Sequence, residues 1–263
     1  MKKAVTLASI LLVSCFLCAH EFWLQPDKYQ YRRGELINVR FWVGENFEGD
    51  NWAGDKSRIN KLQLLLPGDK DDLDNLLSAE KGDSLQFSVF DECTPMVIYN
   101  SNNAFIQLEA AKFNEYLAED GLQNAIDYRN SNNEADSIGK EFYQRSVKTI
   151  LQVGAYKTPV SSATTLPLDI IPLSHPYQLK EGDPITCRVL FNKQPLTNQL
   201  IKIWHRVNGQ TIKEEMHTNE KGDISFTVST TGKWMVSTVN MIRLQNDTAQ
   251  WQSYWSSCTW GYQ

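Results

Sequence analysis

Residues 185–228 read ITCRVLFNKQPLTNQLIKIWHRVNGQTIKEEMHTNEKGDISFTV, a series of runs rich in β-branched residues that are separated by short turn signals. Closely spaced runs of this length are typical of strands joined by tight turns. With the residues that follow, six strands are expected: Ile185 to Phe191, Gln199 to Val207, Ile212 to Thr218, Asp223 to Val228, Trp234 to Met241 and Ser253 to Trp260. Short strands at such regular spacing predict a β-sandwich.

The chain before residue 171 carries a similar pattern. From Glu35 onward, Ile37, Val39, Phe41 and Val43 share one face of a strand. Further strands are expected at Lys61 to Leu66, Leu85 to Phe90, Pro95 to Tyr99 and Ser146 to Val153, one helix at Ala110 to Leu117, and a loop at Tyr128 to Ser137. The run Pro159 to Thr165 is rich in Ser, Thr and Pro and leads towards the second half. We expect an all-β protein of two β-sandwich-like domains, residues 20–170 and 171–263, with one short helix inserted in the first.

The first nineteen residues have the features of a secretory signal. Lys2 and Lys3 precede an uncharged apolar stretch that is too short for a transmembrane span. Cleavage after Ala19 would make His20 the first residue of a periplasmic or secreted protein. A second interpretation stays open, because the residues around Cys15 resemble a lipoprotein processing site that would anchor the protein through a lipid on Cys15.

Composition excludes several classes of partner. Residues 1–19 contain two lysines and no acid, so removing them changes the formal net charge from −5 to −7. An acidic protein is not expected to bind nucleic acid or an anionic membrane surface. No second apolar run is long enough to cross a bilayer. Three cysteines remain after residue 19, Cys93, Cys187 and Cys258, so at most one disulfide forms within the chain, or all three are buried thiols.

His20 is the leading candidate metal ligand. As a terminal residue it would offer both its α-amine and its imidazole to one ion, and nickel, cobalt and copper bind such nitrogens. His175, which precedes Pro176 between the two halves, is the expected second ligand, and Glu21 is a weaker one. The alternative is that His20 caps the first strand and packs beside Trp23. His205 is expected in the core or at its rim, and His217 in solvent.

The aromatic residues support a different class of function. In the last strand Trp251 and Trp255 share one face, while Tyr254, Trp260 and Tyr262 share the other. Exposed aromatics would suit stacking on a glycan or on an envelope protein, whereas buried ones would pack between the halves. No Ser-His-Asp set, paired carboxylates, Cys-His motif or phosphate-binding loop is evident in the sequence, so we do not expect an enzyme.

Several motifs along the mature chain carry a family resemblance. The N-terminal half has His20-Glu21-Phe22-Trp23-Leu24-Gln25-Pro26, Val43-Gly44-Glu45-Asn46-Phe47-x-Gly49-Asp50, Tyr116-Leu117-x-Glu119-x-Gly121-Leu122 and Lys148-Thr149-Ile150-Leu151-x-Val153-Gly154. The C-terminal half has Ile171-Pro172-Leu173-x-His175-Pro176-Tyr177-x-Leu179-x-x-Gly182, Val189-Leu190-Phe191-x-x-x-Pro195-Leu196, Gly232-Lys233-Trp234 and Trp251-x-Ser253-Tyr254-Trp255. With these motifs the chain resembles an uncharacterised-domain family of exported proteins that is often labelled as periplasmic components of nickel and cobalt uptake systems.

The resemblance implies two β-sandwich-like halves, the second similar to transthyretin-like or carboxypeptidase-regulatory modules, and no catalysis. It also implies a membrane transporter component as a partner. Members of the family commonly carry a His-Met pair where this chain has Asn240-Met241, which removes one candidate ligand. The expected function is capture or presentation of a divalent transition metal, nickel or cobalt, for an uptake system. The alternative is a cell-envelope adhesion or glycan-binding module that uses exposed aromatics.

Overall fold

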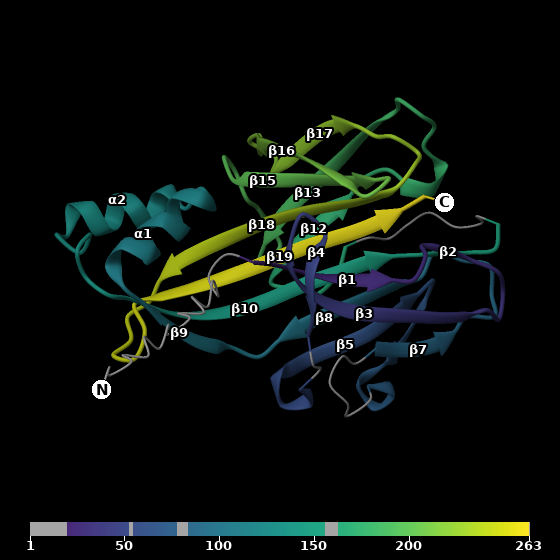
Figure 1. The fold of residues 1–263 in the computed structure, drawn as a ribbon, viewed down its shortest axis with the longest axis horizontal. Coiled ribbons are helices and arrows are strands. Elements are labelled where there is room, and N and C mark those ends of the chain that lie inside the picture. The colour runs from purple at the N-terminus through teal and green to yellow at the C-terminus, as the bar shows by residue number, and fades with distance from the viewer. Residues whose placement is uncertain (1–19, 53–54, 78–83, 156–162, 263) are drawn as a thin grey trace, which may run out of the picture.

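The computed structural model describes residues 20–52, 55–77, 84–155 and 163–262 (Figure 1). The expected signal segment 1–19, with Cys15, lies outside these residues, as does most of the run from Pro159 to Thr165. Within them the protein is mostly β, which confirms the all-β class. No helix in these four ranges is both long and apolar enough to cross a membrane.

A nine-stranded central sheet contains strands from both halves of the chain. Its order is β16-β15-β18-β19-β10-β8-β5-β6, and β9 pairs with β10. The bounds are β5 Ile59–Leu66, β6 Asp69–Asp72, β8 Met96–Ser101, β9 Ala104–Leu108, β10 Gly139–Ile150, β15 Leu200–Val207, β16 Gln210–His217, β18 Lys233–Arg243 and β19 Trp251–Gly261. The halves meet where β10 and β19 pair in parallel. The boundary expected at residue 171 stays a prediction, and the central sheet crosses it.

Two smaller sheets cover the two faces of the central sheet. One consists of β1 (Glu21–Pro26), β3 (Leu36–Glu45), β4 (Glu48–Asn51) and β7 (Ser84–Ser88). The other consists of β12 (Leu168–Pro172), β13 (Pro184–Phe191), β14 (Gln194–Pro195) and β17 (Asp223–Thr227). The pleat of β8 explains the two cores: Val97 and Tyr99 join the core under the first sheet, whereas Met96 and Ile98 join the core under the second.

Two short elements and two helices complete the fold. β2 (Gln30–Tyr31) pairs in parallel with β11 (Gln152–Val153). Helices α1 (Ala110–Glu119) and α2 (Gln123–Ser131) lie at one end of the molecule, where they pack on Val239, Met241 and Trp251 of the central sheet (Figure 1). Three 3-10 turns are also present: η1 (Lys56–Arg58), η2 (Asp74–Leu76) and η3 (Pro176–Gln178).

Local sequence patterns identified most elements but not all. The expected helix at Ala110 to Leu117 is α1, and the expected strand at Ile185 to Phe191 lies within β13. The expected loop at Tyr128 to Ser137 was wrong for its first four residues, because α2 continues to Ser131, whereas the residues from Asn132 to Ser137 lie in turns and a loop. Strand β10 also begins at Gly139, well before Ser146. Cys93, Cys187 and Cys258 are buried free thiols in the structure, in line with the second interpretation of the cysteines.

Candidate functional site

His20 directly precedes a strand that is held firmly in place. It is half-buried, and β1 pairs with β3 along its whole length. Two hydroxyl groups of β19 also bond the β1 backbone: Ser257 donates to the carbonyl oxygen of Phe22 at 2.6 Å, and Thr259 donates to that of Leu24 at 3.0 Å. His20 therefore directly precedes a strand whose position is fixed against both β3 and β19.

Beside His20, the Glu21 side chain lies in a buried charged cluster. Lys202 of β15 donates to Asp120, which follows α1, at 2.6 Å, and both side chains are buried. Burial raises the pKa of Glu21 to about 7, outweighing the opposite effects of Lys202 and of the Ser237 hydroxyl. Asp120 Oδ2 has no hydrogen-bond partner among the described residues. The ammonium group of Lys202 is therefore the nearby positive charge for two buried carboxyl groups, those of Asp120 and Glu21.

A third buried carboxyl group, Glu141 of β10, lies near this cluster. Ser253 donates to Glu141 Oε1 at 3.0 Å, and the indole of Trp255 donates to Ser253 in turn. Tyr116 of α1 stacks on Trp255, with ring centroids 5.7 Å apart. Burial, with a smaller contribution from the charge of Asp120, raises the pKa of Glu141 to about 8, against the opposite effects of its hydrogen bonds to Ser253 and Tyr116.

The structure does not bring His175 to His20. His175 caps η3: its Nδ1 accepts from the Tyr177 amide at 3.1 Å, and its Nε2 lies 2.8 Å from Thr94 Oγ1. Thr94 in turn donates to Gln152 of β11, which lies beyond the far end of β1. The six residues of β1 span ~20 Å at about 3.3 Å per residue. Burial lowers the pKa of His175 to about 4, so the ring is neutral at ordinary pH.

The remaining histidines lie where the strand pattern predicted. His205 is half-buried, stacks on Trp234 with ring centroids 4.1 Å apart, and bonds the Thr231 carbonyl through Nε2. His217 is exposed at the end of β16. Met241 is buried in the core under α1 and α2. Neither histidine lies in a cluster of metal-ligating residues, because the structure holds no group of three or more His, Cys, Asp and Glu suited to a metal ion within its described ranges.

The aromatic side chains of β19 contact a core on each face of the strand. Trp251 packs under the helices, and Trp255 lies against Tyr116. Trp260 lies in the core under the second small sheet, and Tyr254 and Tyr262 pack against that core. Trp251 and Trp260 are buried, whereas Tyr254, Trp255 and Tyr262 are half-buried. The exposed large aromatics among the described residues are instead Phe90 and Phe105.

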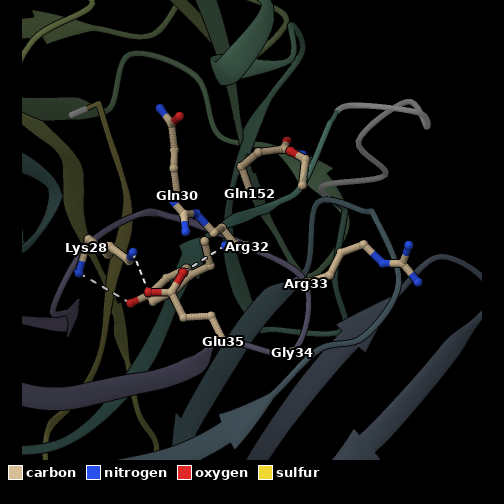
Figure 2. A pocket seen from close by; sticks show the side chains of 9 residues that line it. Lys28, Gln30, Arg32, Arg33, Gly34, Glu35 and Gln152 are labelled. Atoms are coloured by element: carbon tan, nitrogen blue, oxygen red, sulfur yellow. Dashed lines mark hydrogen bonds and ion pairs between the residues drawn. The ribbon is translucent and has the colours of Figure 1, made fainter.

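An open polar pocket lies at the end of the molecule where β2 meets β11. It has a volume of about 740 Å³ and is lined by Lys28, residues 30–35, Gln152 and Gly154. Figure 2 shows Lys28, Arg32 and Glu35 gathered together, while the Arg33 side chain extends away from them. Sequence analysis missed this site, although three cations within six residues of an acidic chain are a visible signal.

Comparisons with known proteins identify a family without a described function. Among curated proteins none matches the chain. The chain is similar to a solved DUF4785 family protein from Legionella pneumophila subsp. pneumophila str. Philadelphia 1, with 12% identity, a TM-score of 0.26, and coverage of 81% of this chain and 50% of that one. It is also similar to Escherichia coli alpha-2-macroglobulin activated by porcine elastase, with 10% identity, a TM-score of 0.23, and coverage of 92% and 20%. The chain thus spans half or less of the length of these two proteins.

The family model for residues 17–242 matches most of the sequence, and the chain belongs to the family described as Domain of unknown function (DUF4198).

Proposed function

We propose that the protein is an exported, non-catalytic binding protein that presents a divalent transition metal, nickel or cobalt, through His20. The observation that supports this proposal is the position of His20. A residue that directly precedes the clamped strand β1 is held at a fixed point of the surface. Cleavage after Ala19 would create a free α-amine at that point, on the same residue as the imidazole.

The coordination offered by His20 is incomplete, and this suits presentation. The terminal amine and the imidazole supply two nitrogens, while the ring nitrogens of His175 take part in hydrogen bonds elsewhere. Glu21 is buried beside Lys202 rather than turned towards solvent. A metal held by two nitrogens keeps open positions, which water or a transporter component can occupy. The ion is therefore accessible for transfer.

The test begins with the N-terminus of the exported protein. Intact mass should show a chain that starts at His20, and a chain that starts at a lipidated Cys15 would contradict the proposal. Nickel, cobalt and copper are then titrated into protein that starts at His20. We expect measurable binding that weakens by about tenfold or more in His20→Ala and in protein with one extra residue before His20, because both lose a chelating nitrogen.

Matched controls separate the chelate from general metal binding. His217→Ala removes an exposed histidine and should leave the affinity unchanged. His175→Gln should also leave it unchanged, because His175 contacts Thr94 beside β11, beyond the end of β1 that is remote from His20. Equal metal binding in His20→Ala and in the unaltered protein would contradict the proposal.

A further inference from the structure

The pocket between β2 and β11 contains three cationic side chains, and the protein itself provides a carboxylate partner for one of them, Lys28. Lys28 is paired with Glu35 Oε1 at 2.5 Å, and the Arg32 backbone amide donates to Glu35 Oε2 at 2.8 Å. These two contacts, the Arg32 amide first, lower the pKa of Glu35, so this carboxylate is ionised and both its oxygens are engaged. Glu35, the one carboxylate among the residues that line the pocket, thus already has partners for both its oxygens within the protein.

The two guanidinium groups remain available to a ligand. Arg32 and Arg33 are both exposed, and Arg33 donates only its Nε, to the Phe90 carbonyl oxygen at 2.8 Å, in the contacts that the structure describes. A guanidinium group offers a planar fork of N–H donors that matches a carboxylate. The two side chains extend in different directions (Figure 2), so one small anion does not reach both. An extended ligand with repeated negative charges can reach both guanidinium groups at once.

The wall of the pocket is rigid. Gln152 is buried, and its amide donates to the carbonyl oxygens of Cys93, Val153 and Gly154 while its oxygen accepts from Thr94. Thr94 in turn bonds His175, so the histidine of the His175-Pro176-Tyr177 motif supports this wall. A preformed wall lowers the entropic cost of ordering a binding site.

An exposed aromatic ring stands at the rim. Phe90 is 69% exposed and its backbone is tied to Arg33. Its ring lies over Gly34, where an added Cβ would approach the ring to 3.1 Å, and the positive φ of +70° at this residue also favours glycine. The apolar face of a sugar ring packs on such an aromatic face. A sugar acid has a carboxylate, which a guanidinium group binds, and an apolar ring face, which packs on an aromatic ring. The guanidinium group of Arg33 beside the exposed ring of Phe90 therefore matches a sugar acid.

We propose that this pocket and its rim bind an anionic saccharide chain, with one carboxylate on Arg32, another on Arg33, and a sugar ring stacked on Phe90. The volume of about 740 Å³ accommodates more than one sugar unit at the scale of ordinary ligand pockets. The site is separate from His20, so it does not depend on the proposed metal function. Its occupant in the cell envelope would be an acidic glycan.

Calorimetric titration with short oligomers of galacturonate, mannuronate and hyaluronate tests the proposal, with a galactose oligomer as the neutral comparison. We expect at least one acidic oligomer to bind, the neutral one to bind more than tenfold more weakly, and the affinity to fall with added salt. The double variant Arg32→Gln/Arg33→Gln and the single variant Phe90→Ala should each weaken binding by about tenfold. Arg40→Gln removes an equally exposed charge from β3 and should change nothing.

The proposal would be overturned by no binding of any acidic oligomer at millimolar concentration, by equal binding of the galactose oligomer, or by unchanged binding in the double arginine variant. Retention of full affinity in Phe90→Ala, with inorganic phosphate competing as well as the oligomer does, would reveal a simple anion site and would also overturn it. His20→Ala should leave saccharide binding unchanged, so that failure of the metal proposal and failure of this one are distinguishable.

Discussion

The ammonium group of Lys202 acts on two buried carboxyl groups, those of Glu21 and Asp120. Glu141 is buried nearby without an ammonium partner among the groups that shift its pKa, and these buried acids make the stability of the protein depend on pH. Burial raises the pKa of Glu21 to about 7 and that of Glu141 to about 8, from an ordinary value of 4.5. Between the ordinary and the raised values, the folded protein holds protons that the unfolded chain has released. The free energy of unfolding therefore falls as pH rises through this window, from about 4.5 to about 8.

Replacing Glu141 by glutamine should remove its part of this dependence. The amide is neutral at every pH, so Glu141→Gln is expected to lose less stability between pH 5 and pH 8 than the unaltered protein, by on the order of 3 kcal/mol. Urea unfolding at several pH values measures the difference. Glu115→Gln, an exposed change on α1, is the control and should leave the slope as it is. An unchanged slope in Glu141→Gln would show that Glu141 is already ionised in the folded protein.

Among the contacts between the helical pair α1–α2 and the central sheet, one leaves no room for an added side chain. Gly139 begins β10, and a Cβ added there would lie 2.2 Å from the Phe113 ring of α1. We expect Gly139→Ala to displace α1 and to destabilise the protein by about 1–3 kcal/mol, as overpacking does. Hydrogen exchange should become faster in both helices. Phe113→Leu in the same chain should restore part of the protection, since it makes room, and failure to do so would argue against this contact as the cause.

How far the sequence predicts each element depends on whether its cause is local. Helix α1 was predictable because Phe113 and Leu117 lie on one face. Helix α2 was not, because its sequence is polar and the buried Arg129 holds it by donating to the carbonyl oxygens of Ala135 and Ser137 and to the Asn114 side chain. These partners come from tertiary contacts that no periodicity encodes.

The candidate sites could likewise be predicted where their cause is local in sequence and could not where it depends on tertiary contacts. His20 and Glu21 could be placed at the first strand from their neighbours in sequence. The separation of His175 from His20 could not, because it depends on η3 docking against Thr94. The cluster of Asp120, Lys202 and Glu21 also joins three segments that are far apart in the chain. The pocket at residues 28–35 had a local signal in its cations, but its wall also includes Gln152 of β11 and Gly154, which are far away in the chain.

On the scale of the whole chain, the central sheet determines how the two halves depend on each other. Strand β10 belongs to the first half and β19 to the second, and they pair in parallel over nine residues, from Glu141 with Trp251 to Thr149 with Thr259. The segments are separated by about a hundred residues, and local alternation gives no information on such a pairing. The first strand adds two further bonds to β19, through Ser257 and Thr259.

We therefore expect the described fold to unfold as one cooperative unit. Separating the halves would expose the edges of β10 and β19 and break the Lys148–Asp169 ion pair, whose two side chains are buried between β10 and β12. Calorimetry should give one transition with equal calorimetric and van't Hoff enthalpies. Lys148→Met leaves the buried Asp169 without its ion-pair partner. This variant should lower the melting temperature of that single transition without splitting it. Two resolved transitions, or a stable proteolytic fragment that begins near residue 171, would show instead that the halves are energetically independent despite their shared sheet.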